Sequence, residues 1–179
     1  NCTGIGAPST NCIDIAEEFP SSDLDLSAGE LVSIDITTTE GPLVRRAKAY
    51  DPNIIGIVPT SPAIVMNGGE VLTGISAQGY QPPPGRTLVA LGGRVPVKVS
   101  TENGSIKTGD FLTSSSVPGI AMKATNKAGQ VIGRAMESYS GKGTGKVFVF
   151  VNTGFHSGTS LKDISSGIEG TDLAKTLIS

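Results

Sequence analysis

The segment SAGELVS (residues 27–33) decides the fold, because a related segment, KTGDFLT (107–113), occurs again later in the chain. RRAK (45–48) and IIGIV (54–58) follow the first segment, and MKAT (122–125) and VIGRA (131–135) follow the second. In each copy the Ala of the middle element precedes the Gly of the last element by nine residues. This order predicts two related halves, each with a turn, a strand, a basic residue before Ala, and a strand centred on Gly.

A Gly followed by an acidic residue opens each copy, as Gly29-Glu30 and as Gly109-Asp110. Glycine adopts positive φ without steric cost, and a carboxylate accepts nearby backbone N–H groups. We therefore expect these four residues to form tight turns that lead into the strands.

Short β-prone runs, divided by Gly, Pro and Asn, fill the chain from Leu31 to Asn152. They predict strands at 31–37, 43–49, 54–58, 63–66, 70–75, 87–91, 94–100, 111–114, 119–124, 131–137 and 146–152. The last run is continuously apolar, which indicates a strand buried on both faces. The predicted fold class is all-β: a compact barrel-like or β-clip-type domain with an internal pseudo-twofold repeat.

The two ends differ from this pattern and divide the chain into an irregular N-terminal arm (1–20), a β domain (21–152) and a C-terminal tail (153–179). The tail is rich in Gly and Ser and cannot bury its apolar residues alone. Because exposed strand edges recruit added segments, we expect the tail or the arm to pack against an adjacent identical subunit. Packing of the tail on its own domain and a disordered tail are the alternatives.

The composition argues against several classes of protein. The 179 residues carry a net charge of −2 and show no basic patch with interleaved aromatic residues, so nucleic acid is not an expected partner. No apolar run reaches the roughly 18 residues of a membrane span. Cys2 and Cys12 are expected to form a disulfide in an extracellular or cell-surface protein, with two free thiols as the alternative.

Several stretches resemble a domain that occurs towards the ends of exported, surface and tail-fibre-like proteins of bacteria and phages. They are DIAEEFP (14–20), LSAGELVSID (26–35), AYDPNIIGIVPTSPAIVM (49–66), VALGGRVPVKVSTENGSIKTGDFLTSSSVPGIAMKAT (89–125) and VIGRAME (131–137). The resemblance covers roughly residues 12–152. It also extends, distantly, to peptidase G2, the autocleaving C-terminal region of phage neck-appendage proteins.

The resemblance implies a candidate cleavage point. In the autocleaving relatives the chain is cut before the Asp of an Asp-x-Ala-Glu motif, whose Asp and Glu take part. The motif falls on Asp14 and Glu17, so the bond at risk is Ile13–Asp14. Ile13 stands where those relatives have a small hydroxyl residue, which counts against cleavage.

The acidic cluster at residues 14–18 leaves three interpretations open. An autoproteolytic pair needs one acid with a raised pKa. A Ca²⁺ site needs the alternating spacing of a calcium loop, which this cluster lacks. In the architectural interpretation the acids cap turns or pair with Arg45, Arg46 or Lys48, while apolar neighbours anchor the segment.

Other motifs give weaker indications of chemistry. The run Ser114–Ser116 lacks a Gly-x-Ser-x-Gly elbow, and the single His of the chain, His156, lies in the tail. GKGTGK (141–146) superficially resembles a phosphate loop, but a strand follows it, which favours a hairpin turn.

The sequence therefore favours a structural assembly module, a subunit of an extracellular homo-oligomeric filament, appendage or fibre. A self-processing fibre domain and a carbohydrate- or surface-binding module are the alternatives. Identical subunits are the expected partners, and contact with a cell surface or glycan belongs to the last alternative. We expect no enzyme activity, with autoproteolysis at Ile13–Asp14 as the alternative, and no metal or cofactor.

Overall fold

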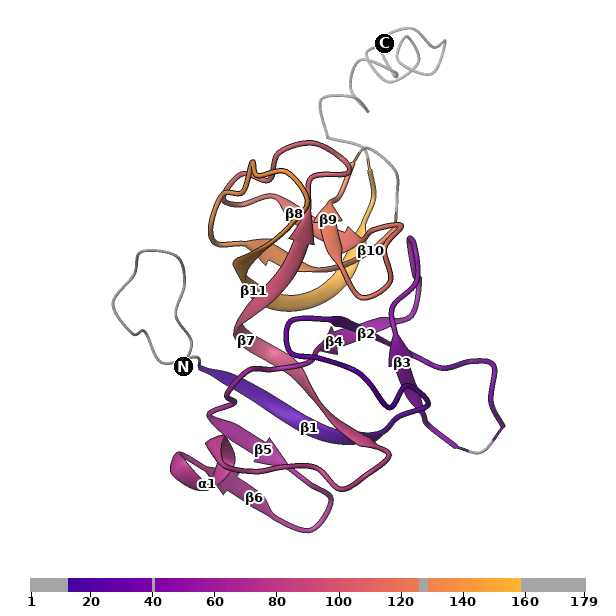
Figure 1. The fold of residues 1–179 in the computed structure, drawn as a ribbon, viewed down its shortest axis with the longest axis vertical. Helices are drawn as coiled ribbons and strands as arrows, with labels where there is room; N and C mark the ends of the chain where they lie inside the picture. The colour runs from indigo at the N-terminus through magenta and orange to yellow at the C-terminus, as the bar shows by residue number, and fades with distance from the viewer. Residues whose placement is uncertain (1–12, 40, 126–128, 159–179) are drawn as a thin grey trace, which may run out of the picture.

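The computed structural model describes residues 13–39, 41–125 and 129–158, which form eleven strands and one short helix (Figure 1). The strands are β1 (Asp14–Pro20), β2 (Leu31–Ile34), β3 (Val44–Arg46), β4 (Ile54–Ile57), β5 (Ile64–Met66), β6 (Val71–Thr73), β7 (Arg86–Ser100), β8 (Phe111–Ser114), β9 (Ala121–Lys123), β10 (Gly129–Ala135) and β11 (Thr144–His156). The helix α1 spans Ile75–Gln78. Across the described ranges, no helix has the length and apolar character needed to cross a membrane. The prediction of an all-β domain is confirmed.

The strands close into two rings that share the long strand β7. In the second half of the chain, β7 pairs with β11, β11 with β10, β10 with β8, and β8 with β9, which returns to β7 at Val99. In the first half, β7 pairs with β1 and β4, β4 with β2, and β2 with β3. A bridge between Ser21 and Val44 then joins the end of β1 to β3. Figure 1 shows β7 running from the lower ring into the upper one.

The predicted repeat is present as two copies of one turn-and-strand unit. Gly29 and Gly109 have φ of +87° and +91°. The carboxylates of Glu30 and Asp110 each accept the N–H of the residue three positions earlier, at 3.1 and 2.9 Å. In both copies the N–H of the turn Gly donates to the end of the Gly-centred strand segment, at Val58 and Ala135. The same local chemistry therefore builds β2 and β8.

The remaining elements of the repeat also correspond. Arg46 of β3 pairs with Glu30 at 2.9 Å, and Lys123 of β9 pairs with Asp110 at 2.9 Å. Each basic residue therefore ties its strand to the turn of its own copy.

The two Gly-centred strands cross a neighbouring strand at very short range. A Cβ on Gly56 would lie 2.4 Å from the carbonyl oxygen of Ala90, and one on Gly133 would lie 2.1 Å from that of Phe150. Glycine is required at both positions because β4 and β10 approach β7 and β11 backbone to backbone.

The core is divided by the two rings. The interior of the first ring holds Val32, Val44, Val58 and Val89, with Phe19, Leu26 and Ile55 packed against them. The interior of the second ring merges with the outer face of the first in one large cluster, which includes Leu31, Ile57, Ala90, Val97, Ile132 and Val151. A third cluster under α1 holds Ala16, Val65, Ala77 and Leu88. The outer face of the first half is thus covered, partly by α1 and partly by the second half.

Residues 14–20, which the sequence predicted to be irregular, form strand β1. The strand pairs with β7 on one side and with β5 on the other. The predicted strands 87–91 and 94–100 are one continuous strand, β7, which passes through Gly92 and Gly93. In both cases the pairing partner is distant in the sequence, so the local pattern did not indicate it.

The prediction that residues 146–152 are buried on both faces is wrong. Burial alternates along β11, and the side chain of Phe150 is 51% exposed while Val149 and Val151 are buried. One face of β11 packs inside the second ring, while the residues of the other face are exposed or half-buried. The strand also extends to His156, past the expected end of the β domain.

Candidate functional site

Asp14, the first member of the implied autocleavage pair, opens strand β1 as a buried carboxyl group. Its side chain is 2% exposed, and neither carboxylate oxygen has a hydrogen-bond partner among the described residues. Burial raises the pKa of Asp14 to about 6, although nearby backbone N–H groups, including that of Ala63, partly oppose this effect.

The peptide bond before Asp14 is held tightly against β7. The N–H of Arg94 donates to the carbonyl oxygen of Ile13 at 2.9 Å. A Cβ on Gly93 would lie 2.2 Å from the same oxygen and 2.6 Å from the Cα of Asp14. Only a glycine in β7 permits this approach, which fixes the position of the Ile13–Asp14 bond.

The structure does not bring Asp14 and Glu17 together. Successive side chains of a strand point to opposite faces, so residues three apart lie on different sides of β1. Burial follows this rule, because Asp14, Ala16 and Glu18 are buried while Glu17 is half-buried on the other face. Two carboxyl groups on opposite faces of one strand do not face each other, so they do not share a proton in this conformation.

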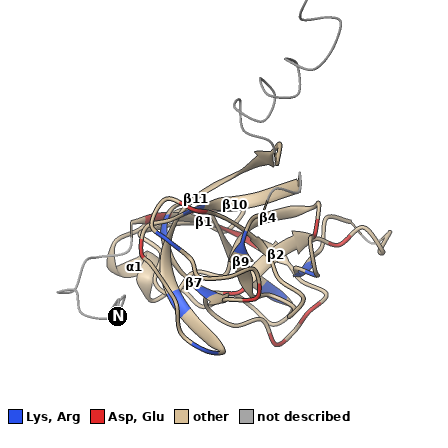
Figure 2. Cartoon of the chain, turned by 90° about the horizontal axis from the view of Figure 1, so that it is seen from above, with Lys and Arg blue, Asp and Glu red and all other residues tan. Residues whose placement is uncertain are grey.

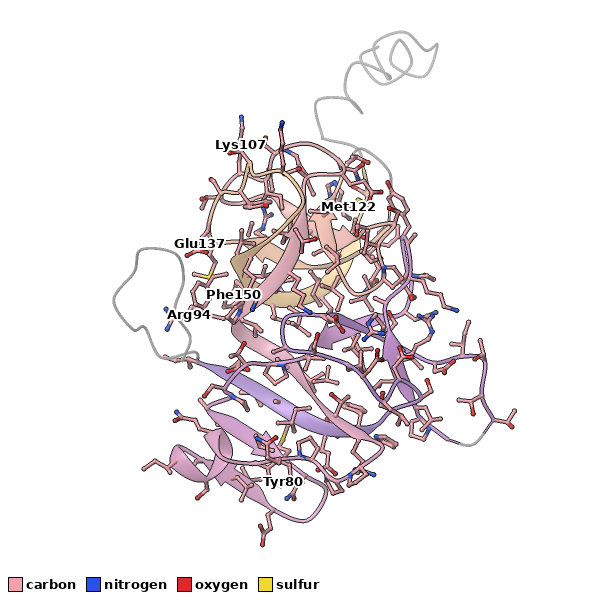
Figure 3. All side chains as sticks on the ribbon, viewed as in Figure 1. Tyr80, Arg94, Lys107, Met122, Glu137 and Phe150 are labelled. Atoms are coloured by element: carbon pink, nitrogen blue, oxygen red, sulfur yellow. The ribbon has the colours of Figure 1, made fainter. Side chains whose placement is uncertain are left out.

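Glu18 has an architectural role, but its partners differ from those predicted. Its carboxylate pairs with Arg86 of β7 and accepts a hydrogen bond from the hydroxyl of Tyr80, which Figure 3 shows beside β6. Arg45 and Arg46, the partners expected from the sequence, are engaged elsewhere, at Asp51 (2.6 Å) and at Glu30. The predicted pairing was wrong because Glu18 lies opposite Leu88, two positions from Arg86 on β7, while Arg45 and Arg46 pair with other carboxylates.

These arginines belong to a network of ion pairs that holds the first half together. Burial disfavours ionisation of Glu30, but Lys98, Ser27 and Arg46 together hold its pKa below the usual value. Hydrogen bonds from Ser22 and Thr37 lower the pKa of Asp35 to about 2. Figure 2 shows acidic and basic positions interspersed along the ribbon, as such a network requires.

The other candidate residues do not assemble into a catalytic group. The hydroxyl oxygen of Ser114 accepts the N–H of Asp51 at 2.8 Å, and the ring of His156 stacks 5.1 Å from that of Phe111. Within the described ranges no hydrogen bond joins His156 to any residue of the Ser114–Ser116 run, and no three His, Cys, Asp or Glu side chains form a metal-binding group. Cys2 and Cys12 lie outside the described residues, so their disulfide stays a prediction.

The most distinctive feature of the surface is an apolar groove in the first half, which we call the open groove. Its volume is about 250 Å³, and its walls come from β1, β2, β4, β7 and the segment before β3. The lining includes Phe19, Ile34, Leu43, Ile55 and Leu91. Ile34 and Leu91 are 42% and 37% exposed, which is unusual for large side chains that gather in one place.

A second surface that no other described residue covers lies on the outer face of the second ring, and we call it the Phe150 face. Cross-strand pairing places Arg94, Phe150, Arg134 and Phe111 in one row across β7, β11, β10 and β8. The guanidinium of Arg134 stacks 3.7 Å from the centre of the Phe111 ring. Figure 3 shows Arg94 and Phe150 next to each other where β7 enters the upper ring.

Sequence reasoning identified neither surface. An isolated arginine inside an apolar strand, as at Arg94 and Arg134, does indicate an outward-facing position. It does not indicate which strands lie beside it, so the row of alternating aromatic and basic side chains emerges only from the sheet.

Comparisons with known proteins define the fold further. No protein-family model matches the chain, and no curated protein matches it significantly. The structure is similar to the crystal structure of the bacteriophage phi29 gene product 12 C-terminal fragment, with 18% identity and a TM-score of 0.51 over 78% of this chain and 100% of that one. It is also similar to the pre-mature bacteriophage phi29 gene product 12, with 18% identity and a TM-score of 0.50 over 80% of this chain and 22% of that chain. The chain thus has the fold of a phage β domain, and its relation to peptidase G2 stays a prediction.

Proposed function

We propose that the chain is a structural assembly module, a subunit of an extracellular homo-oligomeric filament, appendage or fibre of the phage type. The observation that carries the proposal is the fold match, which covers the whole C-terminal fragment of a phage gene product. Fold alone does not fix function, so the proposal also depends on the site. There, the described residues form ion pairs, an apolar groove and an exposed face of alternating aromatic and basic side chains.

Concentration-dependent assembly tests this function. Sedimentation velocity of the purified chain at rising concentration is expected to show oligomers, and electron microscopy is expected to show rings, fibres or filaments. Identical subunits are the proposed partners. A chain that stays monomeric at every concentration contradicts the proposal.

A self-processing domain is the second candidate, and Asp14 is the observation that favours it. The carboxyl group has a raised pKa, and it adjoins the bond that the resemblance marks. One of the two similar structures is that of a pre-mature protein. The position of Glu17 on the opposite face of β1 argues against the implied pair.

Mass spectrometry of the intact chain distinguishes the structural assembly module from the self-processing domain. We expect one full-length species after prolonged incubation at pH 5 to 7, for the wild type and for Asp14→Asn alike. Fragments that meet at Ile13–Asp14 in the wild type, and are missing from Asp14→Asn, would establish self-processing instead.

A further inference from the structure

The internal repeat lets each surface position in one half be compared with its counterpart in the other. Ile57 pairs with Ala90 on one side and Leu31 on the other, just as Arg134 pairs with Phe150 and Phe111. Gly56 crosses Ala90 as Gly133 crosses Phe150. The first part of β7 therefore has the place in the first half that β11 has in the second.

The counterparts of the Phe150 face are covered inside the chain. Leu31, Ile57 and Ala90 are each 0% exposed, and they belong to the same core cluster as the interior of the second ring. Strand β4 contacts both β10 and β11. The first half thus uses this face to cover the interior of the half that follows it.

The counterparts of the open groove in the second half are the residues that Leu31, Ile57 and Ala90 cover. Phe19, Ile55 and Leu91 of the groove correspond to Val97, Ile132 and Val151 of the second ring, which are at most 3% exposed. They share one core cluster with Leu31, Ile57 and Ala90. The described residues contain no repeat before the first half that could cover its interior residues, so the groove is open.

We infer that two copies of the chain repeat this internal contact, so that the Phe150 face of one copy covers the open groove of the next. The inference rests on the proposed function, because it specifies the contact through which identical subunits assemble. The two surfaces are different, so the contact is head to tail and generates a ring or a filament. The residues of the Phe150 face are larger than Leu31, Ile57 and Ala90, their buried counterparts in the first half. The open groove has room for a large side chain.

The charges around the two surfaces are complementary. Arg94 and Arg134 flank Phe150, and no carboxylate among the described residues forms an ion pair with either of them. Glu17 lies on the same face of β1 as Phe19, at the side of the groove, and it has no ion-pair partner in the described ranges. Arg134 stacks on Phe111 and donates to the carbonyl oxygen of Gly109, which leaves its positive charge without a carboxylate. A copy docked in the inferred way brings these two arginines towards Glu17, which favours this orientation over its reverse.

Paired surface variants test the head-to-tail contact by sedimentation velocity. Leu91→Glu blocks the groove and Phe150→Glu blocks the face, and both side chains are exposed enough in the monomer to be changed without loss of fold. Each variant alone is expected to stay monomeric, because every copy lacks either the intact groove or the intact face that the contact needs. An equimolar mixture is expected to form a defined heterodimer, because one intact groove and one intact face remain.

Milder substitutions measure the strength of the contact. Leu91→Ala and Phe150→Ala are each expected to weaken association about 30-fold, the factor that corresponds to the roughly 2 kcal/mol of an interface hot spot. Ile75→Glu, a change at a side chain that is 90% exposed on α1, is the matched control and is expected to assemble as the wild type does.

The outcomes that overturn the inference differ from those that overturn the proposed function. If both glutamate variants assemble as the wild type does, while removal of residues 159–179 gives monomers, the tail is the connector and the inference is wrong. A mixture that forms no heterodimer also refutes the head-to-tail contact. If the wild-type chain remains monomeric, both the proposed function and the inference are wrong.

Discussion

Replacing Asp14 by Asn is expected to change how the stability of the domain depends on pH. The carboxyl group is buried, has no hydrogen-bond partner among the described residues, and has a pKa raised from 3.8 to about 6. Because each pKa unit corresponds to about 1.4 kcal/mol, the ionised carboxylate costs the folded state on the order of 3 kcal/mol near neutral pH. Asn has nearly the same shape and never ionises, so this cost disappears.

The direction of this pH dependence follows from the number of protons that the folded and unfolded states bind. Between pH 3.8 and about 6 the folded state keeps a proton on Asp14 that the unfolded state has released. Stability therefore falls as the pH rises through this window. The favourable contribution of the protonated group is complete below pH 3.8 and is lost above about pH 6.

Urea unfolding of both proteins at several pH values from about 4 to 7 measures this effect. The free energy of unfolding of Asp14→Asn, relative to the wild type, is expected to rise by about 3 kcal/mol over that range. Other carboxyl groups, such as Asp35 with its pKa of about 2, affect both proteins equally and cancel. A difference that stays constant with pH refutes the reasoning, because burial then does not oppose ionisation of Asp14.

Two substitutions test the fold, and a peptide map tests the disulfide. Gly133→Ala is expected to destabilise the domain by about 2 to 4 kcal/mol, because its Cβ would lie 2.1 Å from a carbonyl oxygen of β11. Gly129→Ala, with no atom of the described residues within 4 Å of the new Cβ, is the near-neutral control, and equal melting temperatures of the two variants contradict the prediction. Glu18→Gln is expected to cost about 1 to 3 kcal/mol in urea unfolding through loss of its ion pair with β7, and an unchanged midpoint argues against that role. Peptide mapping without reduction is expected to recover Cys2 and Cys12 linked, and alkylation of both under those conditions excludes the disulfide.

The turn residues are the part of the fold that the sequence by itself determined best. Gly29 and Gly109, each followed by an acid, have the positive φ and the carboxylate-to-backbone hydrogen bonds expected of them. These features depend on contacts within four consecutive residues, so the local sequence contains all the information they need. The repeat followed from them, because the same turn chemistry appears twice with the same spacing.

The tertiary structure alone decided what lies against each strand. Asp14 is buried because β5 and β7 flank β1, and nothing in residues 11–20 indicates either neighbour. Leu31 and Phe111 occupy the same place in their copies, yet Leu31 is buried between the two rings while Phe111 lies on an outer face. Both strands begin with two consecutive apolar residues, Leu31-Val32 and Phe111-Leu112, so the local sequence did not distinguish the outer face that another layer covers from the one that is exposed. The open groove and the Phe150 face therefore arise from the order in which the two halves stack, a property of the packed molecule that no single segment specifies.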